Sequence, residues 1–274
     1  AKRRAIIEED FFLTLFRWCA DAAYLAHPRC IASLPASYAA AKSKPGPDLP
    51  ASPDARYSRP LRNGFVAAAC DLSLPAVLDA YGRGLLLQWL GGSPAWWSPA
   101  QRVTGNPADA TAPEAALGLL AGANVRISLD REYASVAKHC ARKAILRGQP
   151  LQPGQSGLAT LTRLHDAGFA HSVEIWDKAG NLIGGCHGIA NGRAFFTQAS
   201  FGFTPAAEDL ALVALNRHLA LWDFCCHDIS ASRNGSSFGF REQSREDLLS
   251  CLAVCLSGDR RGRWLADPEL CCSR

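Results

Sequence analysis

The chain has 274 residues, of which 48% are hydrophobic and 20% are charged, and it carries a formal net charge of +4. This composition is typical of a globular protein and excludes a largely disordered chain. The charge permits a phosphate-bearing partner without requiring one, and no apolar run reaches the roughly 18 residues that a membrane span needs.

The N-terminal segment predicts a helix followed by a linker. Residues 8–26 place large apolar side chains at near-helical spacing behind an acidic first turn. Acidic residues from Glu8 to Asp10 stand where a secretory signal would have its apolar core, so we expect a cytoplasmic protein. The chain is then dense in Pro, Ala and Ser, which is linker composition, and residues 1–58 form this N-terminal region.

The 11 cysteines are expected to be mostly free, reduced thiols, because the number is odd and no secretory signal is evident. Adjacent cysteines occur at 225–226 and 271–272, and a further pair lies four residues apart at 251 and 255. There is no CxxC motif, and adjacent cysteines rarely bind one tetrahedral ion together. We therefore expect structural thiols and no metal.

A small domain is predicted over residues 59–123. The segment DLSLPAVLDAYGRG has a capping residue at Asp71 or Ser73, apolar residues along one helical face, and Gly84 as a plausible end. An aromatic loop follows, and residues 106–123 are expected to form a loosely patterned connection.

Regular patterning begins near residue 124 and indicates an α+β domain over residues 124–274 with a mixed sheet. A hairpin is predicted around the turn DKAGN. The expected elements are a strand at 124–130, helices at 131–147 and 155–167, the hairpin at 171–197, a helix at 205–222, a strand at 223–231 and a helix at 242–256.

Two surfaces fit nucleic acid as well as a simpler role. Trp89, Trp96 and Trp97 either cap a hydrophobic core or offer stacking faces to an unpaired base, with Arg102 near a phosphate. The helix at 131–147 has a basic edge that suits a solvated face equally well.

Three short nucleotide- or metal-binding motifs are absent from the sequence: there is no GxxxxGK[ST], GxGxxG or HExxH. Gly184 and Gly185 interrupt a strand pattern, which often marks close approach of a ligand or of another backbone. Asp228 follows an apolar approach at a strand end, where it could serve as a general base or form a turn.

Several segments together resemble the leucyl/phenylalanyl-tRNA–protein transferase family. They are PLRNGFVAAACDLSLPAVLDAYGRG, WWSPAQR, RLHDAGFAHSVEIWDKAGNLIGGCHGIANGRAFF and HDISAS…SFG, in family order over roughly residues 60–255. The resemblance implies an N-acetyltransferase-like core without acetyl-coenzyme A. It also implies transfer of an aminoacyl group from tRNA to the N-terminal Arg or Lys of a protein, which marks that protein for degradation.

The resemblance also implies roles for individual residues. Asp228 matches the catalytic aspartate that steers the attacking amine, and Trp89 resembles the tryptophan that stacks on the terminal adenine. With Trp96, Trp97 and Arg102 it would hold the tRNA 3′ end. The aminoacyl pocket would comprise Gly184, Gly185, Cys186, His187, Phe195, Ser200 and Phe201. Aminoacyl-tRNA would be the co-substrate of a monomeric enzyme that needs no cofactor.

Departures from the family gather at these positions. Gln198 replaces a glutamate and Ser230 replaces a glutamine, and both belong to the expected catalytic site beside Asp228. Cys186 and Ser200 stand where the family has methionines, and His187 replaces a tyrosine. The pocket is therefore expected to be roomier and wetter than that of the relatives, with weaker preference for leucine.

Three functions remain open at this point. The first is aminoacyl transfer to a protein N-terminus, and the second is transfer to a peptide or small-molecule amine. The third is a non-catalytic module that binds N-termini or charged tRNA. The retained Asp228 favours the enzymes, whereas Gln198 and Ser230 favour the binding module.

Overall fold

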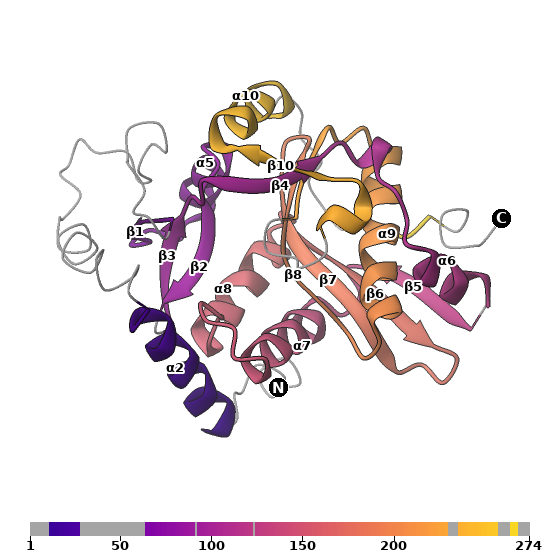
Figure 1. Ribbon diagram of the computed structural model, residues 1–274, viewed down its shortest axis with the longest axis horizontal. Helices are drawn as coiled ribbons and strands as arrows, with labels where there is room; N and C mark the ends of the chain where they lie inside the picture. The colour runs from indigo at the N-terminus through magenta and orange to yellow at the C-terminus, as the bar shows by residue number, and fades with distance from the viewer. Residues whose placement is uncertain are drawn as a thin grey trace. The chain divides into compact units, whose positions relative to one another are not determined.

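The computed structural model describes residues 11–27, 64–90, 92–122, 124–229, 235–256 and 264–267 (Figure 1). The chain forms two compact units, each assembled from separate stretches of sequence. Unit 1 comprises Ala1–Gln101, Ala141–Thr160 and Ser244–Ala253, and unit 2 comprises Arg102–Cys140, Leu161–Gln243 and Val254–Arg274.

Unit 1 contains a three-stranded antiparallel sheet in the order β1-β3-β2. Its elements are α2 (Phe11–Leu25), β1 (Phe65–Ala68), α5 (Leu74–Gly82), β2 (Leu86–Leu90), β3 (Ser93–Trp97) and α10 (Arg245–Cys255). Helix α5 begins as predicted, with Ser73 in an extended conformation at its N-cap. The expected aromatic loop is wrong, because its tryptophans lie on strands β2 and β3.

Unit 2 holds a seven-stranded sheet in the order β10-β4-β9-β8-β7-β6-β5. Its strands are β4 (Gln101–Gly105), β5 (Val125–Leu129), β6 (Ala170–Asp177), β7 (Leu182–Asn191), β8 (Ala194–Gly202), β9 (Cys226–Asp228) and β10 (Arg241–Ser244). Its helices are η1 (Pro107–Asp109), α6 (Glu114–Ala121), α9 (Pro205–Leu221) and η2 (Gly235–Phe238). Helices α7 (Tyr133–Leu146) and α8 (Gln155–Asp166) contribute residues to both units.

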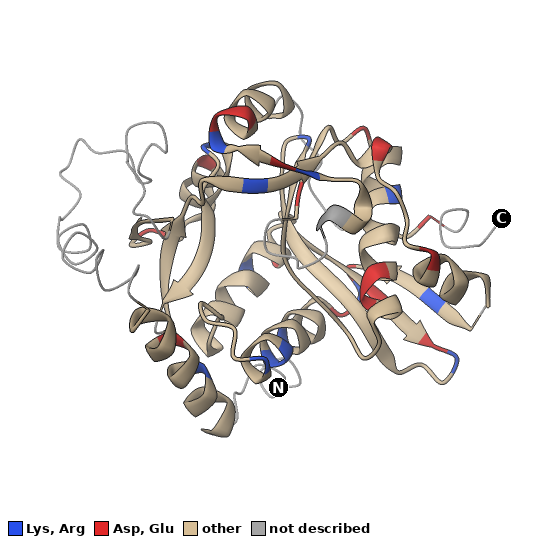
Figure 2. Cartoon of the chain, viewed as in Figure 1, with Lys and Arg blue, Asp and Glu red and all other residues tan. Residues whose placement is uncertain are grey.

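The predicted hairpin is confirmed as β6 and β7, joined by a turn at which Gly180 has a φ of +83°. A third antiparallel strand, β8, follows, and β8 then pairs with β9 in parallel. Strands β7 and β8 carry no Lys, Arg, Asp or Glu (Figure 2). Such uncharged strands suit a sheet that is covered on both faces.

Helices cover both faces of the sheet in unit 2. Helix α9 packs its buried side chains into the main core together with Val173, Cys186 and Phe195. The other face meets α7, where Val136 and Cys140 pack against Phe201. Unit 2 is thus a mixed α+β layer structure, as the sequence predicted.

Some predicted elements are corrected by the structure. The connection expected at 106–123 contains helix α6, and the strand expected at 223–231 is limited to Cys226–Asp228 among the described residues. The last helix starts at Arg245, after strand β10. None of the described helices combines the length and apolar character needed to cross a membrane.

Candidate active site

The candidate active site is built around strand β9, which has three residues and ends at Asp228. Asp228 lies between two strands, because it pairs with Phe196 of β8 and with Thr104 of β4. The residue is 1% exposed. Two flanking strands therefore fix the backbone that carries its carboxylate.

Arg102 of β4 forms a buried ion pair with Asp228, through Nη2 and Oδ2. Side-chain exposure is 0% for Arg102 and 1% for Asp228. A buried pair of this kind is strongly destabilised when one partner is removed, because the other charge is left uncompensated. The place of Arg102 near a tRNA phosphate stays a prediction, and in the structure its guanidinium is buried against the aspartate.

A second set of polar side chains holds His227, the residue before Asp228, in place. His227 Nδ1 lies 2.6 Å from Asn216 Oδ1 on α9, and His227 Nε2 lies 2.7 Å from Thr197 Oγ1 on β8. Burial lowers the pKa of His227 to about 3, so its imidazole is neutral at pH 7. These hydrogen bonds join β8, β9 and α9 one residue away from Asp228. Local sequence patterns did not predict them.

The two strand glycines permit close packing of helices on the sheet. A β-carbon at Gly184 would lie 2.7 Å from the carbonyl oxygen of Ala207 on α9. One at Gly185 would lie 2.7 Å from the carbonyl oxygen of Val173 and 3.2 Å from Val136 on α7. The neighbours that approach these glycines are thus backbone and helix atoms of the protein itself.

The residues of the expected aminoacyl pocket divide between the two faces of the sheet. Cys186 and Ser200 face α9, where the Cys186 thiol donates to Ala211 O at 3.6 Å and the Ser200 hydroxyl donates to Glu208 at 2.8 Å. Burial raises the pKa of the Cys186 thiol well above its usual range, so it is an inert core group. Phe195 belongs to the same core.

The remaining pocket candidates face α7. The hydroxyl of Tyr133 lies 3.3 Å from Nδ1 of His187, and burial lowers the pKa of this histidine to about 4. Phe201 stacks on His139 with ring centroids 4.9 Å apart. The structure therefore does not place all seven predicted residues around one cavity.

Gln198 is half-buried at a register shift in β8. The shift falls between the pairs His187–Ala199 and Gly188–Thr197, so Gln198 occupies the irregular position of the strand. Ser230, the other predicted catalytic residue, lies outside the described residues.

The three tryptophans are core residues of unit 1. Trp89, Trp96 and Trp97 are 3%, 1% and 2% exposed. Trp96 meets Tyr81 edge-on at 6.4 Å, and Trp97 meets Phe65 at 5.5 Å. Their burial supports the first of the two expected roles, a hydrophobic core, and stacking on the tRNA 3′ end stays a prediction.

A buried acid was missed by the sequence reasoning. Glu174 of β6 accepts hydrogen bonds from the hydroxyls of Ser128 and Ser172 at 2.5 and 2.6 Å. The amides of Arg131 and Glu132, just before α7, also donate to it at 3.4 Å. Burial raises the pKa of Glu174 to about 7, and these hydrogen bonds oppose the rise.

A disulfide corrects part of the cysteine prediction. Cys225, just before β9, is bonded to Cys255 at the end of α10, with Cα atoms 6.0 Å apart. Six described cysteines are free. Among the described residues, no group of three or more His, Cys, Asp and Glu side chains could hold a metal ion.

These features define the class: an α+β protein whose mixed sheet holds a buried Asp–Arg pair at the end of a short internal strand. The family model described as Leucyl/phenylalanyl-tRNA protein transferase matches residues 108–253. The chain belongs to this family.

Relatives with the name Leucyl/phenylalanyl-tRNA–protein transferase cover most of the chain. The protein of Pseudomonas syringae is 32% identical over 206 residues, which is 74% of this chain and 89% of that protein. The Nitrosospira multiformis protein is 33% identical over 76% of this chain and 90% of its own length. For the Anaeromyxobacter protein the identity is 33%, over 82% of this chain and 92% of that protein.

Proposed function

We propose that this protein transfers an amino acid of the Leu/Phe type from aminoacyl-tRNA to the N-terminal amine of an acceptor protein, with Arg or Lys as the acceptor residue. Family membership supports the donor and the type of reaction. The observation that carries the proposal within the structure is Asp228, which lies in the matched segment and is fixed between β8 and β4. An N-acetyltransferase-like arrangement of unit 2 is part of this proposal, supported by its mixed sheet with helices on both faces.

The main task of the enzyme in this reaction is to position the amine against the ester carbonyl carbon. The amine nitrogen attacks the ester carbonyl carbon, the new C–N bond forms, and the bond from that carbon to the ribose oxygen breaks. The amine gives up a proton, and the leaving ribose oxygen gains one. Because the ester is already activated, the proposed reaction needs no cofactor, and orientation supplies much of the rate increase.

Asp228 is proposed to orient the attacking amine, with Gln198 at the neighbouring irregular position of β8. Arg102 holds the aspartate in place through the buried ion pair. Arg102 is therefore a positioning residue in this scheme, because it acts through Asp228.

The test is a transfer assay with a full set of charged tRNAs against peptides that bear every N-terminal residue. We expect Asp228→Asn to reduce kcat by about 100-fold or more, as removal of a group that acts on the reacting atoms does, while charged tRNA still binds. Asp223→Asn is the matched control, since Asp223 is an exposed turn residue five positions earlier, and asparagine tolerates its φ of +58°. Equal loss of turnover in both variants would contradict the proposal.

A non-catalytic binding module is the second candidate, and one observation favours it. Asp228 is buried and already neutralised by Arg102, which leaves little carboxylate surface for an amine. Binding of charged tRNA or of peptides without any transfer, in every combination of the assay, would select this function.

A further inference from the structure

Helix α2 turns its charged side chains toward the rest of unit 1. Arg17 is 6% exposed and Asp21 is 3% exposed. Asp21 Oδ1 accepts the backbone N–H of Leu151 at 2.8 Å. These two are the charged residues between Phe11 and Leu25 (Figure 2). The solvent side of the helix therefore carries no charge.

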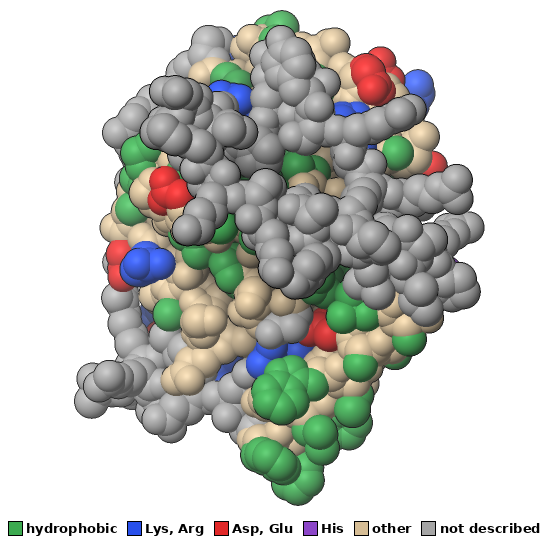
Figure 3. Space-filling model, turned by 90° about the vertical axis from the view of Figure 1, so that its left-hand side faces the viewer, with side chains coloured by type: hydrophobic (Ala, Val, Ile, Leu, Met, Phe, Trp, Pro, Cys, Tyr) green, Lys and Arg blue, Asp and Glu red, His purple; other side chains and the backbone are tan. Residues whose placement is uncertain are grey.

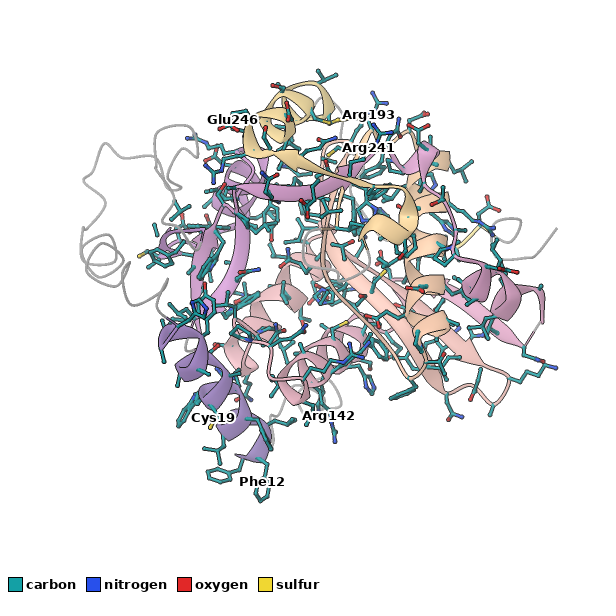
Figure 4. The ribbon with its side chains drawn as sticks, viewed as in Figure 1. Phe12, Cys19, Arg142, Arg193, Arg241 and Glu246 are labelled. Atoms are coloured by element: carbon teal, nitrogen blue, oxygen red, sulfur yellow. A yellow bond between two sulfur atoms is a disulfide. The ribbon has the colours of Figure 1, made fainter. Side chains whose placement is uncertain are left out.

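That solvent side is apolar, which reverses the usual polarity of a surface helix. We call it the α2 face. Figure 3 shows hydrophobic side chains gathered at the lower end of the molecule, and in Figure 4 Phe12 and Cys19 project away from the helix. The α2 face consists of Phe11 (74% exposed), Phe12 (65%), Leu15 (46%), Phe16 (54%), Trp18 (58%) and the exposed Cys19, Ala22 and Ala23.

The spacing of these residues fits a second helix. One row of the α2 face has intervals of four, three and four residues, at positions 11, 15, 18 and 22. A second row has the same intervals, at positions 12, 16, 19 and 23. Alternation of three and four is the repeat that packs side chains of one helix between those of another. The small residues near the C-terminal end allow the two backbones to approach closely.

The area of the α2 face suits a modest dimer. An aromatic side chain buries roughly 150 to 250 Å², so the exposed parts of the four aromatic residues offer about 400 to 600 Å² per chain. Two chains would bury about 800 to 1,200 Å² from these residues alone, with Leu15 and the small residues in addition. This reaches the lower end of specific interfaces. A helix that lies on a membrane usually presents Lys or Arg to the headgroups, and the α2 face has none.

We propose that the α2 face is a homodimer interface, in which α2 packs against α2 of a second copy of this chain about a two-fold axis. A face that matches itself in chemistry and spacing is what a two-fold interface requires. The helix lies outside residues 108–253, so the proposal stands independently of the transfer reaction. It replaces the monomer expected from the sequence.

The first test is the mass of the full-length protein in solution across a concentration series, by light scattering and sedimentation. We expect the wild type to shift toward dimer as concentration rises, and Phe16→Glu with Trp18→Glu to remain monomeric with an unchanged melting temperature. Val254→Glu is the matched control, since Val254 is 70% exposed but lies on α10. A wild type that is monomeric throughout, or a double variant that dimerises like the wild type, would overturn the proposal.

Cys19 provides a second test that needs no disruptive substitution. It lies within one turn of the middle of the α2 face, so two copies bring their Cys19 thiols within reach of a short bismaleimide in either helix orientation. We expect mass spectrometry to find the Cys19–Cys19 cross-link, to lose it in Cys19→Ser and to retain it in Cys70→Ser, which removes another exposed thiol. Absence of the cross-link, or retention of the wild type on phosphatidylglycerol vesicles that the double variant no longer binds, would identify the dimer as wrong.

Discussion

Arg102 and Asp228 are 126 residues apart in sequence and meet only because β4 and β9 are neighbours in the sheet. Removing one member of a buried ion pair typically costs about 3 to 5 kcal/mol. Asparagine keeps the shape of the aspartate while it removes the charge. Turnover of the Asp228→Asn variant therefore has to be compared together with its stability, so that a folding defect is not taken for a catalytic one.

Gly184 offers a prediction about packing. The β-carbon of Gly184→Ala would lie 2.7 Å from a backbone oxygen of α9, which cannot move aside as a flexible side chain would. We expect the variant to be destabilised by about 1 to 3 kcal/mol, seen as a lower urea midpoint.

Gly118→Ala provides the matched comparison for Gly184→Ala. Gly118 is inside α6, and nothing lies within 4 Å of an added β-carbon. Because alanine favours helix over glycine, that variant should be stabilised by up to about 1 kcal/mol. A shift of the same sign in both variants would contradict this account of Gly184.

Glu174 should make stability depend on pH. Its pKa is raised from 4.5 to about 7 in the folded protein, so the folded state retains the proton to higher pH than the unfolded state does. The stability that the neutral form provides is present below about pH 4.5 and is lost as the pH rises to about 7.

Glu174→Gln removes this titration. Relative to wild type, we expect the variant to gain about 3 kcal/mol in unfolding free energy between pH 4 and pH 8, measured by urea unfolding. The lowered pKa values of His187 and His227 act in the opposite direction, with stability lost as the pH falls below 6.5, and they cancel because both proteins retain them. A difference that is constant with pH would show that Glu174 does not titrate in this range.

At the scale of elements, the local signals in the sequence were sufficient for α5, α7, α8, α9 and the β6–β7 hairpin. Helix α6 was not predicted, because its sequence, rich in Ala, Leu and Gly, has weak hydrophobic periodicity. The structure nevertheless buries Ala116 and Leu120 of this helix. Strands β4 and β10 have five and four residues, and their pairing with distant partners decides their conformation.

The candidate site was predicted less completely than the fold. Asp228 could be selected from family resemblance and its strand-end position, but its Arg102 partner depends on a long-range strand pairing. The pocket residues were neighbours in sequence, yet alternation along β7 and β8 sends Cys186 and Ser200 to one face and His187 and Phe201 to the other. Which face a helix covers is a tertiary property that residue spacing does not specify.

The disulfide ties the end of α10 to the approach to β9 across a sequence separation of 30 residues. Closing a loop of that length stabilises a fold by about 3 to 4 kcal/mol through the unfolded state. We expect Cys255→Ser to lower the melting temperature under oxidising conditions and to match the reduced wild type, whereas Cys70→Ser should have no effect. Equal melting temperatures for oxidised and reduced wild type would exclude a stabilising bond.

At the scale of the whole molecule, different parts of the chain support the two proposals. The family model spans residues 108–253, whereas α2 and the three-stranded sheet of unit 1 precede it. The proposed transfer reaction relies on Asp228 in the shared segment and on Arg102 just before it, and the proposed dimer relies on α2, nearer the N-terminus.

The interleaving of the two units also affects the order in which the protein can be made. A ribosome releases the chain from its N-terminus, and domains generally fold as they emerge. Here unit 1 still needs residues 244–253, and the core of unit 2 receives Trp264, whose backbone N–H donates to Asp130 at 2.7 Å. Neither unit can therefore finish folding until these later residues have been made. Strand β4 is made before β9 and β10, which are its partners in the sheet. Until they are made, β4 has unpaired strand edges, which favour aggregation unless a chaperone shields them.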